Sequence, residues 1–187
     1  MKLIECVPNI SEGRNQDIIN QIIKPIQDTS GVHLLDVDPG FDTNRTVITF
    51  IGEPNKVIEV AYKLIKNASK LIDMSNHTGE HPRMGATDVC PLIPVSNVTL
   101  KECIEYSKNL AEKVGKNLNI PVFLYEYSAT NNERKNLANI RKGEYEGMFD
   151  KIKIKEWYPD YGPSENNTRS GATAIGVREF LIAYNIN

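Results

Sequence analysis

Cysteine is scarce in this sequence: only Cys6, Cys90 and Cys103 occur among its 187 residues. An odd number of cysteines without paired spacing argues against a disulfide framework and against a cysteine-based zinc site. We therefore expect reduced thiols. Cys103 falls on the face of an expected helix, and we place it in the core.

The sequence also lacks an excess of charge of one sign. It carries 22 lysines and arginines against 24 aspartates and glutamates, and both signs are spread along the chain. No basic stripe of the kind that binds a phosphate backbone is present, which argues against nucleic acid as a partner. An anionic substrate would have to be bound by a few locally placed arginines.

Long apolar runs are missing as well. The first residues, MKLIECVPNI, lack the apolar core of a signal peptide, and no apolar run approaches the ~20 residues of a membrane span. These absences predict a cytoplasmic protein with no membrane partner. The composition, 40% hydrophobic and 25% charged, is typical of a folded chain, and the length suits one domain over residues 1–187.

Apolar periodicity predicts the helices. Spacings of three and four residues indicate a helix from Asn15, which Pro25 should bend or end. The same spacing indicates a long helix over 54–72 and another over 99–118, and a pair of short helical pieces broken at Gly143 is expected over 131–153. Thr99 and Glu102 are placed to form a capping box at the start of the third helix.

Short apolar and β-branched runs predict strands, with a turn at 38–42, over these ranges: 2–8, 32–38, 45–52, 89–95, 121–125 and 174–187. Two prolines in 89–95 indicate an edge or interrupted strand. The order of elements predicts an α/β (α+β) fold, in which a mixed β-sheet carries helices packed on one face.

Two polar loops, 73–87 and 156–172, hold the polar residues that secondary structure does not need. The first contains His77, Glu80, His81 and Arg83. Two histidines beside a glutamate match an inverted zinc-peptidase signature, but Gly79 and the proline after His81 disfavour the helix that such a site requires. We therefore expect no metal.

Proton transfer suits His81 better, because imidazole titrates close to neutral pH. The alternative, from spacing alone, is a loop histidine that only hydrogen-bonds its neighbours. His33 falls in a strand and is interpreted as a packed or edge residue. Asp36 and Asp38 flank Val37, so both should point to one face of their strand, although turn chemistry also accounts for Asp38.

Four arginines are candidates for binding a carboxylate through two parallel hydrogen bonds: Arg14, Arg45, Arg83 and Arg178. Each alone also fits a surface ion pair. In the second polar loop, Gly162-Pro163-Ser164 and Ser170-Gly171-Ala172 would let backbone amides approach a ligand, although glycine serves any tight turn.

Several strings closely resemble the amino-terminal subdomain of glutamate formimidoyltransferase, and together they cover essentially the entire chain. They are Glu5-Cys-Val-Pro-Asn-Ile-Ser-Glu-Gly-Arg14, Leu35-Asp-Val-Asp38, Thr43-Asn-Arg-Thr46, Leu71-Ile-Asp-Met-Ser75, Gly79-Glu-His-Pro-Arg-Met-Gly85, Asp88-Val-Cys-Pro91, Ile140-Arg141 with Gly143-Glu-Tyr-Glu146, Pro159-Asp-Tyr-Gly-Pro-Ser164 and Phe180-Leu-Ile-Ala-Tyr-Asn-Ile-Asn187.

The resemblance implies a folate-dependent transferase of histidine breakdown and one-carbon metabolism. It would move a formimino or formyl group from N-formiminoglutamate to tetrahydrofolate as co-substrate, with His81 as general base. Beside this base, the residues themselves offer Asp38, Arg45, Glu80 and Arg83 as substrate-binding or orienting candidates. The resemblance also implies a folate-binding loop made of Gly162, Pro163, Ser164, Glu165, Asn166, Asn167, Thr168, Arg169, Ser170 and Gly171.

The family carries a C-terminal subdomain beyond the stretch matched here, and folate lies between the two subdomains. The resemblance therefore implies one half of a site, completed in a homodimer or by a separate chain that holds the C-terminal subdomain. An uncovered apolar sheet face would favour such pairing. A non-catalytic folate-binding module or accessory subunit is the alternative.

Overall fold

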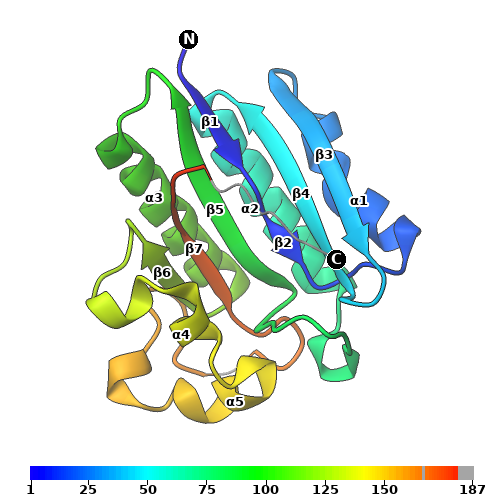
Figure 1. Ribbon diagram of the computed structural model, residues 1–187, viewed down its shortest axis with the longest axis vertical. Coiled ribbons are helices and arrows are strands. Elements are labelled where there is room, and N and C mark those ends of the chain that lie inside the picture. The colour runs from blue at the N-terminus through cyan, green and yellow to red at the C-terminus, as the bar shows by residue number, and fades with distance from the viewer. Residues whose placement is uncertain (166, 181–187) are drawn as a thin grey trace, which may run out of the picture.

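The computed structural model describes residues 1–165 and 167–180 and contains one mixed β-sheet (Figure 1). Its strands are β1 Leu3–Cys6, β2 Asn9–Ile10, β3 Val32–Gly40, β4 Arg45–Gly52, β5 Thr87–Ser96, β6 Val122–Glu126 and β7 Thr173–Val177. From one edge to the other the order is β3, β4, then β1 and β2 in line, β5, β7 and β6. The pairings of β7 with β5 and β6 are parallel, and the others are antiparallel. The mixed sheet is confirmed.

Three long helices cover one face of this sheet: α1 Gln16–Gln27, α2 Pro54–Leu71 and α3 Leu100–Leu118 (Figure 1). The strands supply the other half of this core through alternation, since every second residue of β4 is buried. The predicted capping box at Thr99 and Glu102 is confirmed, and Cys103 lies fully buried as expected.

The expectation of helices on one face alone was wrong at one corner of the sheet. Two short helices, α4 Leu137–Arg141 and α5 Glu144–Lys151, pack on the opposite face near β6 and β7 (Figure 1). There Met148 and Phe123 belong to a second apolar cluster, separate from the core under the long helices. The two helices cover the apolar side chains that alternate residues of β6 place on that face, which would otherwise contact water.

Several predicted boundaries moved. The opening strand is split at Val7-Pro8, the second strand runs on to Gly40 so that the turn is 41–44, and the last strand ends at Val177. Its predicted continuation over 181–187 lies outside the described residues.

β5 is a central strand and not an edge, despite its prolines. The Pro91 carbonyl accepts a hydrogen bond from the Val7 amide (3.1 Å). In a strand, the N–H and C=O of one residue point to the same side, so the N–H that Pro91 lacks faces the break between β1 and β2. The sheet therefore tolerates this proline in its middle.

Pro25 lies in the last turn of α1, and the helix continues past it to Gln27. A proline lacks the N–H that would bond the carbonyl four residues earlier, here that of Gln21. The side-chain amide of Asn67 on α2 donates to this carbonyl instead (3.2 Å). This bond joins α1 to α2.

We expect Asn67→Ala to lower the free energy of unfolding by about 1 kcal/mol, the usual net contribution of one hydrogen bond. In a Pro25→Ala background the same change should cost less, because the residue 25 amide would then satisfy the Gln21 carbonyl. Urea denaturation of the two single variants and the double variant measures this coupling. Equal costs of Asn67→Ala in both backgrounds would contradict the assignment.

Candidate functional site

The loop between α2 and β5 is pressed against the β3–β4 turn. A Cβ on Gly79 would lie 2.4 Å from the Thr43 carbonyl oxygen, so no other residue fits there without displacing the backbone. The Glu80 amide donates to the Asp42 carbonyl (3.2 Å). The backbone on the N-terminal side of His81 is thus fixed by contact with the turn.

His81 is half-buried, and its ring orientation defines its tautomer. Nδ1 lies 2.6 Å from the Pro82 carbonyl oxygen, which only accepts, so Nδ1 carries the proton. Nε2 of the neutral ring is then an unprotonated acceptor. A base needs such a lone pair.

The surroundings of His81 favour its neutral form. Burial lowers the pKa of His81, the positive charges of Arg45 and Arg141 lower it further, and the bond to Pro82 and the charge of Asp88 oppose this. The ring is therefore unprotonated, and able to accept a proton, at neutral pH.

Arg45 and Asp38 lie on the same sheet face, because their positions on β4 and β3 are in register on that face. Arg45 donates to the side-chain oxygen of Asn9. Burial lowers the pKa of Arg45, the charge of Arg141 lowers it further, and the negative charges of Asp88 and Asp38 oppose this. Asp36 shares this face, as predicted. The face is thus polar beside His81.

A β-bulge places Asp88 in this group. Asn9 pairs with Val89 and Ile10 with Thr87, so Asp88 is the extra residue of β5. The Asp88 side chain is buried, accepts from the Met84 amide (3.0 Å) and forms an ion pair with Arg141 of α4. One carboxylate therefore joins the end of the His81 loop to α4.

Lys151 supports the α4 end of this arrangement. Its ammonium donates to the carbonyls of Ile140 (2.8 Å) and Lys142 (3.2 Å) and lies 3.9 Å from the centre of the Trp157 ring. Burial, followed by the charges of Lys142 and Arg134, lowers its pKa to about 8. Lysine at a helix C-terminus satisfies carbonyls that the helix leaves free.

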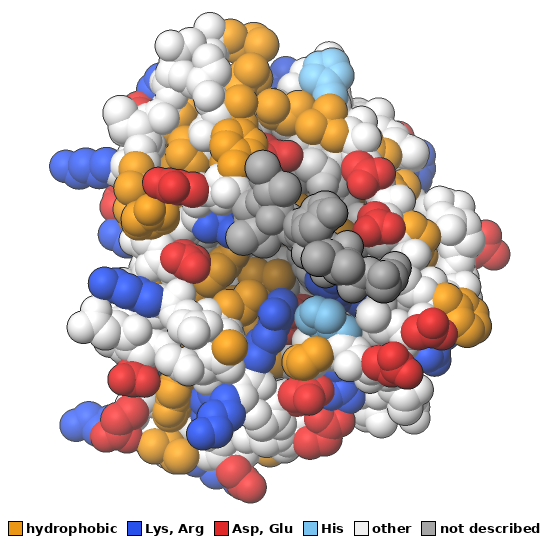
Figure 2. Space-filling view, viewed as in Figure 1, with side chains coloured by type: hydrophobic (Ala, Val, Ile, Leu, Met, Phe, Trp, Pro, Cys, Tyr) orange, Lys and Arg blue, Asp and Glu red, His pale blue; other side chains and the backbone are white. Residues whose placement is uncertain are grey.

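A cavity of about 390 Å³ opens beside His81, lined by His81, Pro82, Ala138, Asn139, Arg141, Lys142, Gly143 and Glu144. Figure 2 shows basic side chains around a histidine on the lower half of this face. The cavity thus combines a neutral imidazole with two cationic side chains, Arg141 and Lys142, and one carboxylate, Glu144. The two cations could bind an anionic group of a ligand that gives up a proton to the imidazole.

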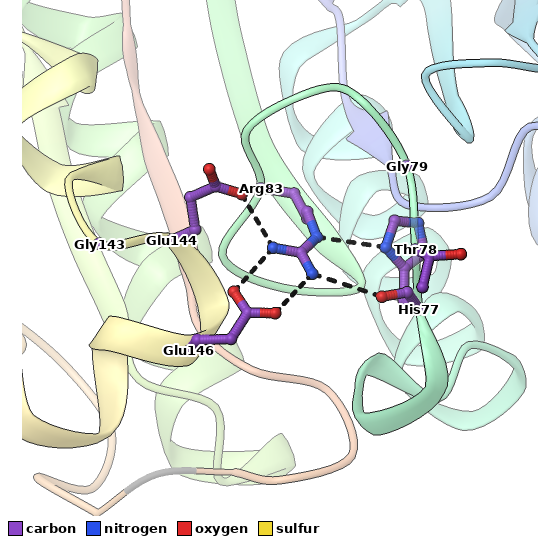
Figure 3. A pocket seen from close by; sticks show the side chains of 7 residues that line it. All are labelled: His77, Thr78, Gly79, Arg83, Gly143, Glu144 and Glu146. Carbon is purple, nitrogen blue, oxygen red and sulfur yellow. Dashed lines mark hydrogen bonds and ion pairs between the residues drawn. The ribbon is translucent and has the colours of Figure 1, made fainter.

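Arg83 is engaged within the protein and is not free to bind a carboxylate in this conformation. It is 8% exposed and pairs with Glu144 (2.9 Å) and Glu146 (2.7 Å) of α5 (Figure 3). On its other side Nε donates to Nδ1 of His77 (3.3 Å). The geometry favours an orienting role for Arg83 over direct clamping of substrate.

Both ring nitrogens of His77 are used in hydrogen bonds, which leaves none for a metal. Within residues 1–165 and 167–180, no group of three or more histidines, cysteines and acidic residues could hold a metal ion. The zinc-peptidase interpretation therefore has no geometric support.

The remaining sequence candidates lie apart from the cavity walls. Arg14 stacks on the exposed ring of Phe41, Arg178 donates to the Glu179 carbonyl, and Glu80 is exposed. His33 is exposed on the edge strand β3, in agreement with its interpretation as an edge residue.

The second polar loop divides into two parts. Pro163, Glu165, Asn167 and Thr168 line another cavity of about 470 Å³ with Asn119. This cavity and the one beside His81 share none of their lining residues. Asn166 lies outside the described residues.

The C-terminal part of this loop packs under the His81 loop. Gly171 has φ +63°, and a Cβ on it would lie 2.2 Å from the Met84 carbonyl oxygen. The Ser170 carbonyl accepts from the Ala86 amide (2.8 Å), so the two polar loops share a backbone ladder.

Sequence reasoning assigned no role to Asn9, Asp88 or Arg141. A carboxylate directly before the apolar run Val89–Leu92 was the available signal, because a buried charge requires a cationic partner. The identity of that partner, 53 residues away, needed the fold.

No helix among the described residues has the length and apolar character needed to span a membrane.

Comparison with known proteins identifies the family of the chain. The sequence model of the family described as formiminotransferase domain, N-terminal subdomain, matches residues 3–178. The chain is 54% identical to a formimidoyltransferase-cyclodeaminase of Dictyostelium discoideum and 48% identical to a glutamate formimidoyltransferase of Streptococcus pyogenes serotype M1, each over its whole length. It spans 35% and 62% of those two relatives. The chain belongs to the family of the formiminotransferase domain, N-terminal subdomain.

Proposed function

We propose that the chain is the catalytic N-terminal part of a folate-dependent formimidoyltransferase, with His81 as general base. The observation that carries this proposal is the bond from Nδ1 of His81 to the Pro82 carbonyl, which leaves Nε2 free to accept a proton beside a cavity. The names of two relatives, a formimidoyltransferase-cyclodeaminase and a glutamate formimidoyltransferase, support the reaction class. We propose in addition that the reaction is the folate step of histidine breakdown.

The proposed reaction moves one carbon between two nitrogens. A ring nitrogen of tetrahydrofolate forms a bond to the carbon of the protonated amidine of N-formiminoglutamate, the π pair of the C=N bond moves onto the imino nitrogen, and His81 takes the proton from the attacking ring nitrogen. The imino nitrogen then re-forms its double bond to the carbon, the bond from that carbon to the glutamate nitrogen breaks, and the imidazolium returns the proton to this leaving amine. Glutamate is released and the imidazole is neutral again.

Arg45, Arg141 and Lys142 are proposed to bind the carboxylates of the substrates. Both substrates end in glutamate carboxylates, and guanidinium groups bind carboxylates through paired hydrogen bonds. Asp38 and Glu80 are proposed to orient the ring nitrogen or the amidine, and Arg83 to orient the loop. No metal takes part in this scheme.

The loop Gly162–Gly171 is proposed to contact folate. The first part of the loop lines a separate cavity, and its last part is hydrogen-bonded to the backbone of the His81 loop. Folate bound to the last part could therefore affect the position of His81. Tetrahydrofolate is the co-substrate in this proposal.

The proposed site needs a second half. Residues 1–187 are taken as one N-terminal subdomain, and the curated relatives continue well beyond the matched stretch. A separate chain with the C-terminal subdomain, or a second copy of this chain, would complete the folate site in the cytoplasm.

An assay with N-formiminoglutamate and tetrahydrofolate tests the proposal. Formation of the formimino product, followed by absorbance, supports an enzyme, and a parallel assay with N-formylglutamate identifies the donor. Folate binding measured by calorimetry without turnover, even after a C-terminal subdomain chain is added, would favour the alternative of a folate-binding module.

A further inference from the structure

His77 joins two parts of the molecule through its two ring nitrogens (Figure 3). Nε2 lies 3.0 Å from the Asn44 carbonyl oxygen, and Nδ1 lies 3.3 Å from Nε of Arg83. A carbonyl only accepts and a guanidinium only donates, so Nε2 carries the proton and Nδ1 accepts. The contacts fit the neutral ring alone.

Both neighbours of His77 are themselves fixed. Asn44, in a left-handed conformation with φ 45°, accepts from the Gly13 amide (3.0 Å) and donates to the Thr78 carbonyl (2.9 Å). Arg83 is held by Glu144 and Glu146 at the start of α5. His77 therefore closes a hydrogen-bonded path from the β3–β4 turn to α5.

Two residues of this path, His77 and Arg83, lie on either side of His81 in the sequence. The loop between His77 and Arg83 carries His81 and is tied at both ends by the same two side chains. We propose that His77 is a positioning residue which, as a neutral imidazole, holds the His81 loop between the β3–β4 turn and α5, and that protonation of His77 releases this loop. For catalysis this inference rests on the proposed function.

The charges around His77 set the direction of the effect. Protonation would place Nδ1–H against Nε–H of Arg83 and would add a positive charge near Arg83 and Arg14, with Glu12 as the opposing charge. Glu144 and Glu146 face Arg83 from α5. The hydrogen bond with Arg83 lowers the pKa of Glu146, so that carboxylate stays ionised at mildly acidic pH.

Burial, followed by the positive charge of Arg83, lowers the pKa of His77, and the bond to Asn44 opposes this. An opened loop would return the pKa to about 6.5 and would bind the proton more tightly. The closed loop is thus fully stable above about pH 6.5 and loses stability as the pH falls.

Hydrogen exchange of the loop amides tests the inference without any turnover. In the wild type, protection of the Glu80 and Met84 amides should fall by up to about tenfold per pH unit below about pH 6.5. In His77→Asn, which keeps the acceptor for Arg83, and in His77→Gln, which keeps the donor to Asn44, this dependence should weaken to the part that His81 contributes, because neither side chain titrates while His81, whose pKa burial also lowers, still does. His33→Asn, at an exposed histidine, should behave as the wild type.

Enzyme kinetics add a second readout. If both histidines must be neutral, log kcat/KM of the wild type should fall with a slope of about 2 at low pH, and that of His77→Gln with a slope of about 1. A protection profile in His77→Asn and His77→Gln that keeps the wild-type pH dependence, or a wild type without any such dependence, would overturn the inference. Loop release without formimino transfer, measured after a C-terminal subdomain chain is added, would leave this inference intact and would refute the proposed function instead.

Discussion

His81→Ala is expected to lower kcat/KM for formimino transfer by about 100-fold to 10,000-fold, the usual contribution of a general base. Folate binding should persist, because the basic side chains of the cavity and the loop Gly162–Gly171 remain. Steady-state kinetics with calorimetric folate titration measures both quantities.

The matched control is His33→Ala, which removes an exposed histidine far along the sheet edge and should leave both quantities unchanged. Added imidazole should restore part of the activity of His81→Ala, since it can enter the cavity as a substitute base. Wild-type kcat/KM in His81→Ala would rule out this residue as the base.

Asp88→Ala is expected to lower the free energy of unfolding by about 3–5 kcal/mol, because it leaves the partly buried guanidinium of Arg141 without its carboxylate. The Met84 amide would lose its acceptor as well. Urea denaturation measures the change, and the extrapolated free energy is the quantity to compare.

Asp28→Ala is the matched control, since Asp28 pairs with Lys24 on the surface with both side chains more than half exposed. That pair should contribute at most about 1 kcal/mol. Similar losses of stability in the two variants would show that the bulge does not hold Asp88 in a buried ion pair.

Helices and strands were predictable here because their signals are local. The isoleucines of α1 repeat at helical spacing, and the Thr99 capping box lies within four residues. The place of a strand in the sheet was not predictable in this way. β5 contains prolines and still lies in the middle of the sheet, because Pro91 lies beside the break between β1 and β2, where its missing N–H is tolerated. These residues are about 80 positions apart in the sequence, so no local signal reveals their contact.

In the candidate site, too, local features could be predicted from the sequence, and contacts between residues distant in the sequence could not. The polar loop 73–87 and the near-neutral titration of imidazole made His81 a candidate for proton transfer, and the family resemblance then implied its role as the base. The state of Arg83 could not be predicted, since its glutamate partners lie 61 and 63 residues later on α5. Asp88 escaped notice because its side chain is turned toward Arg141 by a bulge, which only the pairing of β5 with β2 reveals.

The position of β1 and β2 affects the order in which the chain can fold. The β3–β4 hairpin can form from neighbouring residues, but the first strand must then fit between β4 and β5, and β5 meets β7 only after some eighty further residues. Pairings so distant in the chain carry a high loop-closure entropy and slow folding. The segment that forms β1 and β2 thus gains its second neighbour, β5, only after residues 87–96 have been added to the chain.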